Sequence, residues 1–207
     1  LVMTATPIPR TVALTVFGDL DVSLVREMPA GRLPVNTRWP RQEQREVIYA
    51  ELADALRSGR QAYIVCPVVE NHEDLRSAET VYKELSSGPL REFRLGLLHG
   101  RMDDAVKADV MERFRQREMD VLIATTVVEV GVDVPNATWL VVEHAERFGL
   151  SQLHQLRGRV SRGTEAGVCI LFGEPLTDEG KQRLRTMLQT NDGFTLAEED
   201  ARLRGTG

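Results

Sequence analysis

Continuously apolar stretches and stretches with helical periodicity follow one another along most of the chain. Six short segments predict β-strands, at 35–40, 61–69, 93–98, 119–125, 138–143 and 167–172. Segment 61–69 is rich in β-branched residues and almost wholly apolar, as expected for a central strand that is covered on both faces of a parallel sheet. Between the strands, apolar residues spaced like Val47, Ile48 and Leu52 predict helices over 42–58, 75–87, 103–115 and from Ser151 onward.

The order of these elements predicts the class of fold. Strands and helices alternate from about residue 35 to residue 172, which favours an α/β fold with a parallel sheet and helices on both faces. Two more helices are predicted at 177–189 and 196–204, with a turn at 191–193 between them. Two helices joined by a tight turn form a helical hairpin, which we expect at the end of this sequence.

Composition and charge restrict what the chain can do. Its net charge is −5 at pH 7, so any contact with nucleic acid must come from a local basic patch. Cys66 and Cys169 each lie in an apolar run without metal-site spacing, and we interpret them as buried free thiols of a reducing compartment. No apolar run is long enough to cross a membrane and no signal peptide is visible, so we expect a cytoplasmic location and no membrane partner. The sequence starts at Leu1 within an apolar stretch, and we expect a fragment of a longer protein.

An arginine cluster at 152–163 is the first candidate site. Arg157, Arg159 and Arg162 lie close together, and on a helix Arg159 and Arg162 would share a face with Gln155. Two guanidinium groups on one face suit a polyphosphate, because each binds phosphate oxygens through two hydrogen bonds and keeps its charge. The cluster alone leaves open the alternative of a solvated basic face.

Two further segments follow predicted strands and carry groups suited to phosphate. His99, Gly100 and Arg101 follow one strand. His99 either contacts phosphate there or only completes the hydrogen bonding of the loop. Thr125 and Thr126 follow the next strand, with hydroxyls and exposed backbone N–H groups at an expected helix start. Such a helix start favours phosphate binding.

Gly131 and Asp133 come next, where the glycine permits close approach and the carboxylate can bond a hydroxyl group or organise an arginine. Thr4 and Thr6 lie in a segment punctuated by prolines, and by themselves they favour a linker.

Three of these segments, taken in order, carry a resemblance to a known family. Gln155-x-x-Gly158-Arg159-x-x-Arg162 resembles the last motif of superfamily 2 helicases and translocases, 124–135 resembles their fifth motif, and 4–11 resembles their third. Over essentially its whole length the chain resembles the bacterial members that move along branched DNA. Segment 192–207 resembles the translocation motif that those members share with transcription–repair coupling factors.

The resemblance implies a domain organisation and an activity. Residues 1–30 would be the end of a first motor domain and a linker, 31–175 a second RecA-like motor domain, and 176–207 an incomplete hairpin translocation motif. Such proteins use ATP and Mg²⁺ to move along double-stranded DNA and to remodel stalled forks and Holliday junctions. The phosphate-binding loop and the acidic magnesium motif belong to the first motor domain, and neither they nor the wedge domain occur here. We therefore expect the isolated fragment to be inactive.

The resemblance also implies roles for individual residues. Arg162 would be the arginine finger with Arg159 beside it and Gln155 positioning one of them, while Gly131 and Asp133 would face the nucleotide. Contact with the DNA backbone would come from His99, Gly100, Arg101, Thr125 and Thr126. Coupling of hydrolysis to movement would involve Thr4, Thr6, Arg183 and Arg204.

Some features of the sequence leave alternatives open. Ser161, Ala201 and Thr206 depart from the usual glycine, leucine and proline of the motifs, and Ala201 puts the packing of the hairpin in doubt. The alternatives are a transcription–repair coupling factor and a non-catalytic DNA-binding module that keeps only the fold. The stretches 18–22 and 63–70 resemble the branched-DNA translocases more than the coupling factors.

Overall fold

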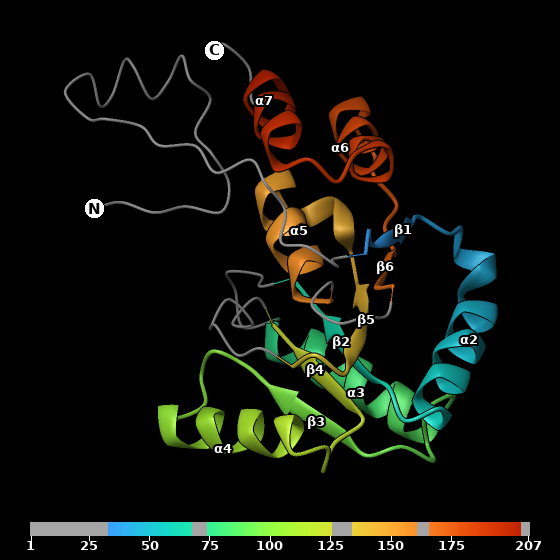
Figure 1. Cartoon of the computed structure of the whole chain (residues 1–207), viewed down its shortest axis with the longest axis vertical. Coiled ribbons are helices and arrows are strands. Elements are labelled where there is room, and N and C mark those ends of the chain that lie inside the picture. Colours follow the sequence, from blue (N-terminus) through green and yellow to red (C-terminus); the bar gives the residue numbers. More distant parts are fainter. Residues whose placement is uncertain (1–32, 68–73, 126–133, 161–165, 204–207) are drawn as a thin grey trace.

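The computed structural model describes residues 33–67, 74–125, 134–160 and 166–203, and these form a six-stranded sheet (Figure 1). In spatial order the strands are β1 (Asn36–Arg38), β6 (Val168–Leu171), β5 (Ala137–Val142), β2 (Gln61–Val65), β4 (Val121–Ala124) and β3 (Leu95–Leu98). Every neighbouring pair is parallel. The predicted α/β fold with a parallel sheet is therefore confirmed. Most of the strands are shorter than the apolar runs, because those runs continue into buried loop residues such as Cys66.

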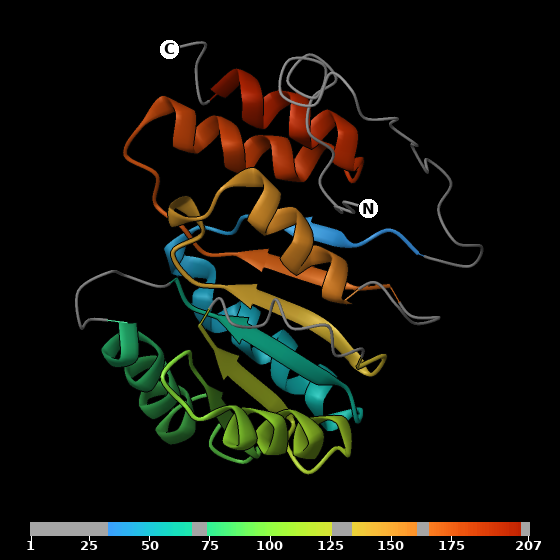
Figure 2. The same ribbon diagram turned by 90° about the vertical axis from the view of Figure 1, so that its left-hand side faces the viewer.

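Helices cover both faces of this sheet, and Figure 2 shows α2 and α5 on opposite sides. The helices that pack on one face are α2 (Arg45–Arg57), which follows the 3-10 turn η1 (Gln42–Gln44), and α3 (Asp74–Ser87). Those of the other face are α4 (Asp104–Arg115), α5 (Leu150–Arg157), α6 (Asp178–Gln189) and α7 (Gly193–Leu203). Within the described ranges, no helix is long and apolar enough to cross a membrane.

Strand β2 shows why the apolar runs are continuous. Successive side chains of a strand point to opposite faces, so Tyr63 and Val65 pack in the core on the α5 side while Ala62 and Ile64 pack in the core on the α2 side. The ring of Tyr63 meets Phe114 of α4 with centroids 5.1 Å apart. A strand buried on both faces has no solvent side on which polar residues are favoured.

The predicted hairpin is present as α6 and α7, and it belongs to the core on the α5 side. Leu184 and Met187 of α6 and Leu196 of α7 are fully buried together with Leu153 and Leu156 of α5. The hairpin therefore shares this core with α5.

The start of each hairpin helix is fixed by a capping side chain. The Thr177 hydroxyl accepts a hydrogen bond from the N–H of Gly180 at the start of α6. Asp192 accepts from the N–H and the hydroxyl of Thr195, and α7 therefore begins at Gly193. The prediction that this helix begins at 196 is wrong, because the expected turn at 191–193 ends in an N-cap.

Helix α5 differs from the prediction at both of its ends. It begins at Leu150 after the N-cap Gly149, so Ser151 is not its cap, and the Ser151 hydroxyl instead donates to Asp200 of α7. The α-helix ends at Arg157, and a 3-10 turn, η4 (Gly158–Val160), follows it. Arg159 is therefore not on the same α-helix as Gln155, consistent with the low helix propensity of glycine at the junction.

Candidate nucleotide and DNA interfaces

The parallel sheet sorts the candidate residues onto two opposite edges. Segments that follow strands lie at the carboxyl edge, and segments that lead into strands lie at the amino edge. Helix α5 starts after β5 and runs back across the sheet, so η4 lies at the amino edge beside the start of β6. The backbone of Val160 occupies the space that a Cβ at Gly167 would need, which fixes this close approach of η4 to β6.

The amino edge holds the described part of the candidate nucleotide set. Arg159 lies half-buried in η4, and Gln155 is exposed on α5 one turn earlier. Val134 is buried just before β5, and the neighbouring Asn136 accepts a hydrogen bond of 3.0 Å from the N–H of Gln61. Gly131, Asp133 and Arg162 lie outside the described residues, as do Thr4, Thr6 and Arg204.

The carboxyl edge holds the described part of the candidate DNA set. His99 follows β3, and its carbonyl accepts from the N–H of Met102, which makes a tight turn with Gly100 and Arg101 exposed at its tip. The Nδ1 atom of His99 is buried and has no hydrogen-bond partner within the part of the chain that the structure describes. The turn therefore presents an exposed arginine at the end of β3, beside a buried histidine nitrogen that bonds to none of the described residues.

Thr125 follows β4, and its position corrects one expectation. Its N–H donates to the carbonyl of Leu98 at 3.1 Å, and the residue is 3% exposed. The expectation that Thr125 presents an exposed N–H group is therefore wrong, because the parallel ladder between β3 and β4 continues one residue beyond the strand. Thr126 lies outside the described residues.

Arg157, the first arginine of the cluster, binds the end of α6. Arg157 is 3% exposed, and its guanidinium donates to the carbonyl oxygens of Met187 and Thr190 at the end of α6, each at 2.9 Å. Burial lowers the pKa of this guanidinium, but arginine starts so far above neutrality that it stays charged. Arg157 is thus a structural link between α5 and the hairpin, and it cannot bind phosphate in this arrangement.

Sequence reasoning missed a buried ion pair at the end of β5. Glu143 is 5% exposed, and it accepts hydrogen bonds from Nη1 and Nη2 of Arg45 and from the Tyr49 hydroxyl, the last at 2.9 Å. Arg45 also lies over the ring of Phe172, 4.5 Å from its centroid. Burial, followed by the negative charge of Glu143, raises the pKa of Tyr49 well above its usual value. A glutamate that follows an almost wholly apolar strand was the available signal, because a buried carboxylate requires a partner.

The described residues do not provide a magnesium site. No group of three or more His, Cys, Asp or Glu side chains that could hold a metal ion occurs within these ranges.

The six-stranded parallel sheet with helices on both faces defines a RecA-like domain. The chain belongs to the family described as the helicase conserved C-terminal domain, whose model matches residues 43–164. It is also similar over its whole length to a particular member, the ATP-dependent DNA helicase RecG. The identity is 49% with RecG of Streptococcus pneumoniae and 50% with RecG of Bacillus subtilis, in each case over 209 residues and 100% of this chain. The chain spans 31% of the length of each of these relatives.

Solved structures agree with this assignment. RecG bound to a three-way DNA junction matches with a TM-score of 0.82 and 43% identity, over 98% of this chain and 27% of that one. The C-terminal domain of the DEAD-box protein Dbp5 matches with a TM-score of 0.52 over 77% of this chain and 84% of that one. Because the identity with Dbp5 is only 18%, that match supports the fold alone.

Proposed function

We propose that this chain is the second motor domain of an ATP-driven translocase of the RecG type that remodels stalled replication forks and Holliday junctions. The observation that carries the proposal is the similarity to RecG over the entire chain, with 49% identity across all six strands and the hairpin. A solved RecG is bound to a three-way DNA junction, which supports branched double-stranded DNA as the partner of this chain. The bacterial relatives support a cytoplasmic location in bacteria.

The amino edge of the sheet would face ATP. In phosphoryl transfer, negative charge on the γ-phosphate must be stabilised in the transition state, and an arginine supplied across a cleft does this. Arg159 projects from a turn whose backbone is held against β6 at Gly167, so its guanidinium is carried by a rigid part of the fold. Arg162 would be the finger, with Arg159 beside it, Gln155 as the positioning residue and Gly131 and Asp133 towards the nucleotide.

The carboxyl edge would face DNA. Arg101 is exposed at the tip of the turn after β3, and the buried Nδ1 of His99, which bonds to no described residue, lies in the same turn. With Gly100 and Thr126, these residues would approach the DNA backbone from the opposite edge to the nucleotide. The sheet between the two edges is buried on both faces, so it would move as a rigid body. Closure of the ATP-binding cleft at the amino edge would then move the DNA contacts at the carboxyl edge.

The hairpin would turn this closure into movement along DNA. Arg157 joins the last turn of α5 to the end of α6, and Nη1 of Arg183 donates to the carbonyl of Phe148 at 3.3 Å just before α5. The hairpin is thus bonded at both ends of the helix that precedes the candidate finger. With Thr4, Thr6 and Arg204, Arg183 would couple hydrolysis to translocation. ATP and Mg²⁺ would be bound mainly by a first motor domain, and the wedge domain would be a further partner.

A chimera tests this proposal directly. The corresponding 31% of Bacillus subtilis RecG is replaced by this chain, which is 50% identical to it. We expect the chimera to hydrolyse ATP when forked DNA is present and to unwind the fork, and we expect the 207-residue chain alone to do neither. Phosphate release and fork unwinding are measured on the same substrate, with the parent RecG as the control.

Two outcomes would contradict the proposal. A chimera that folds and binds forked DNA but does not hydrolyse ATP would favour a non-catalytic module that keeps only the fold. A chimera whose ATP hydrolysis requires added RNA polymerase would instead favour a transcription–repair coupling factor.

A further inference from the structure

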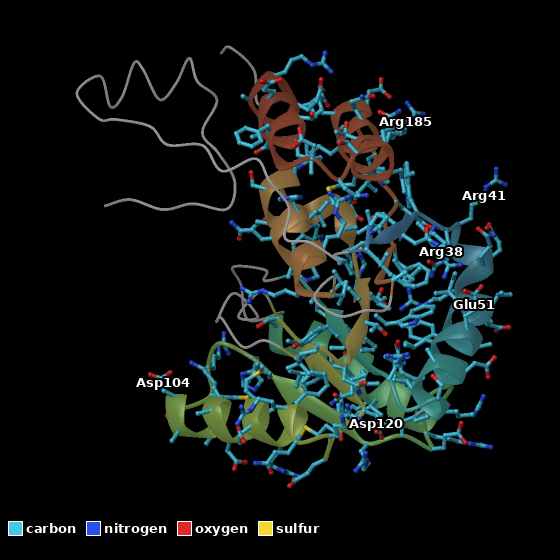
Figure 3. All side chains as sticks on the ribbon, in the orientation of Figure 1. Arg38, Arg41, Glu51, Asp104, Asp120 and Arg185 are labelled. Carbon is cyan, nitrogen blue, oxygen red and sulfur yellow. The ribbon has the colours of Figure 1, made fainter. Side chains whose placement is uncertain are left out.

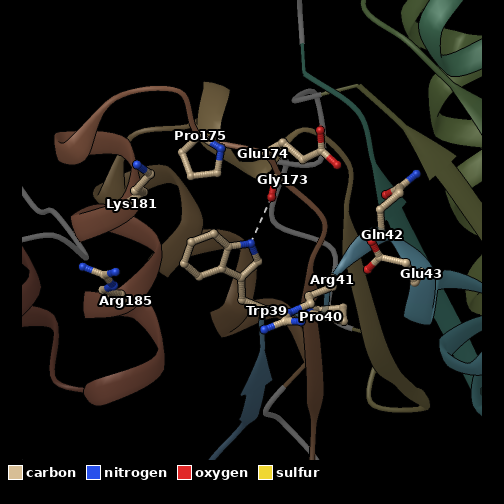
Figure 4. A pocket seen from close by; sticks show the side chains of 10 residues that line it. All are labelled: Trp39, Pro40, Arg41, Gln42, Glu43, Gly173, Glu174, Pro175, Lys181 and Arg185. Carbon is tan, nitrogen blue, oxygen red and sulfur yellow. Dashed lines mark hydrogen bonds between the residues drawn. The ribbon is translucent and has the colours of Figure 1, made fainter.

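A groove with a volume of about 450 Å³ opens where β1, β6 and α6 meet, away from both sets of candidate residues. Its walls include an aromatic ring, three cationic side chains and two carboxylates: Trp39, Arg41, Lys181, Arg185, Glu43 and Glu174. Figure 4 shows the indole of Trp39 in the middle, with Lys181 and Arg185 on one side and the two glutamates on the other. The groove lies at the carboxyl edge of the sheet, at the opposite end of that edge from β3.

The indole ring is held in a fixed position. Nε1 of Trp39 donates to the carbonyl of Gly173 at 2.9 Å, and the ring packs partly against the hydrophobic core. A Cβ at Gly173 would lie 2.6 Å from a carboxylate oxygen of Glu146, so the loop that carries this carbonyl is itself closely packed. With its N–H already bonded, the indole can offer the groove only an apolar aromatic surface.

The cations around the ring are available to a ligand. Lys181 and Arg185 are four residues apart on α6, which places them on the same side of that helix. Arg41 and Arg185 make no ion pair within the described residues, and both extend outward on the same side of the molecule (Figure 3). Lys181 has only a long contact of 3.4 Å with Asp178, whose side chain is 99% exposed, and such surface pairs are weak.

We propose that this groove binds a short segment of single-stranded DNA, with a base stacked on Trp39 and the adjoining phosphates on Lys181, Arg185 and Arg41. Aromatic rings with flanking cations are the combination by which proteins hold single strands without reading sequence. Branched DNA presents a displaced strand next to the duplex, and the groove shares the carboxyl edge with the candidate duplex contacts. This proposal rests on the proposed action on branched DNA and adds a second contact to it.

An acidic peptide fits the same groove less well. Such a peptide would bring carboxylates to the cations, but it would also require hydrogen bonds for its backbone. The Trp39 N–H and the Gly173 carbonyl already satisfy each other. Glu43 and Glu174 would repel further acidic side chains, whereas the amino groups of a base can donate to carboxylates.

Trp39 itself reports binding. The chain contains two tryptophans, and Trp139→Phe leaves Trp39 as the only one. We expect the fluorescence of this variant to be quenched saturably by an octamer of deoxythymidine and to be unaffected by an octamer of glutamate. In this background Lys181→Ala/Arg185→Ala should weaken the affinity at least tenfold and should lower the slope of log affinity against log salt by about 1.4. Arg202→Ala on α7, where the side chain is 64% exposed, is the matched control and should change neither quantity.

Substitution of Trp39 separates stacking from charge. With labelled oligonucleotide anisotropy as the readout, Trp39→Leu should weaken binding at least about fivefold, while Trp39→Phe should retain most of the affinity. Quenching by octaglutamate equal to that by the oligonucleotide would overturn the proposal, and so would a Trp39→Leu variant that folds and binds as tightly as the parent. Neither measurement needs ATP or Arg159, so their failure would leave the motor function untouched. A chimera without ATPase activity would likewise leave this site untouched.

Discussion

The guanidinium of Arg157 donates to the main-chain carbonyl of Thr190 at 2.9 Å, which ties the last residue of α5 to the C-cap of α6. The last carbonyls of an α-helix have no partner within that helix, and here a buried cation from another helix supplies one. The hydrogen bond therefore joins the segment that leads into the candidate arginine finger to the helical hairpin.

Removal of this link should destabilise the chain. Arg157→Ala would leave buried carbonyl oxygens without donors and would remove charge-assisted hydrogen bonds, so we expect the free energy of unfolding to fall by about 2–4 kcal/mol. Urea unfolding measures this change, and hydrogen exchange should show faster opening of α6 and α7.

Arg202→Ala is the control for this substitution. Arg202 pairs with Glu199 on the surface of α7, and exposed pairs of this kind contribute little. If Arg157→Ala cost no more than Arg202→Ala, the link would not hold the hairpin.

The Asp192 cap of α7 predicts a defined dependence of stability on pH. Hydrogen bonds from the hydroxyl and the N–H of Thr195 hold the pKa of the Asp192 carboxyl below its usual value. A carboxyl whose folded pKa is lowered stabilises the fold fully above its unfolded pKa of about 3.9, and this stabilisation is lost as pH falls through the folded pKa. Asp192→Ala should cost about 1 kcal/mol at pH 7.

Asp192→Asn separates the cap from the charge. The amide oxygen can still accept from Thr195, so stability at pH 7 should change little, whereas the part of the acid destabilisation that Asp192 causes should disappear. Urea midpoints between pH 7 and pH 3 give both quantities. A parallel loss of stability in the wild-type chain and in Asp192→Asn below pH 4 would show that this carboxyl does not contribute.

The fold could be predicted from the sequence because the order of apolar and polar residues within each short segment indicates a strand or a helix. A strand such as β2 is buried on both faces, and this leaves an unbroken apolar run that is visible without any knowledge of the partners. The helices that pack against it show helical periodicity for the same reason. The exact ends of some helices could not be predicted, because the pattern of apolar and polar residues does not mark them. Helix α5, for example, ends at Arg157 and is followed by a 3-10 turn.

The roles of the candidate residues were harder to predict, because the type of a residue does not reveal whether its side chain is buried. Arg157 and Arg159 look equivalent in the sequence, yet the first is 3% exposed and bonded to the hairpin, while the second lies half-buried at the amino edge. The pairing of Arg45 with Glu143 joins residues 98 positions apart, which no local pattern encodes. Trp39 was likewise interpreted only as part of a strand, since its groove depends on the later packing of α6.

The finger role can be tested in the RecG chimera. Arg162→Ala should leave stability nearly unchanged and ATP affinity modestly reduced, while kcat should fall by about three orders of magnitude or more because charge in the transition state is no longer stabilised. Arg115→Ala, an exposed arginine of α4 paired with Glu112, is the matched control and should keep full activity. An unchanged kcat in Arg162→Ala together with a large loss in Arg159→Ala would transfer the finger role to Arg159.

The coupling role of Arg183 gives the last prediction, again in the chimera. Arg183 is half-buried and donates from α6 to the Phe148 carbonyl, so it links the hairpin to the loop that follows β5 at the carboxyl edge, away from the candidate nucleotide residues of the amino edge. A residue in that place can transmit movement but cannot contact ATP. We therefore expect Arg183→Ala to leave ATP hydrolysis stimulated by forked DNA largely intact while fork unwinding falls at least tenfold. Arg183→Lys, which keeps a donor of similar reach, should recover part of the unwinding, and both rates are measured on one substrate. Equal losses of hydrolysis and unwinding would instead make Arg183 a contributor to folding or to DNA binding.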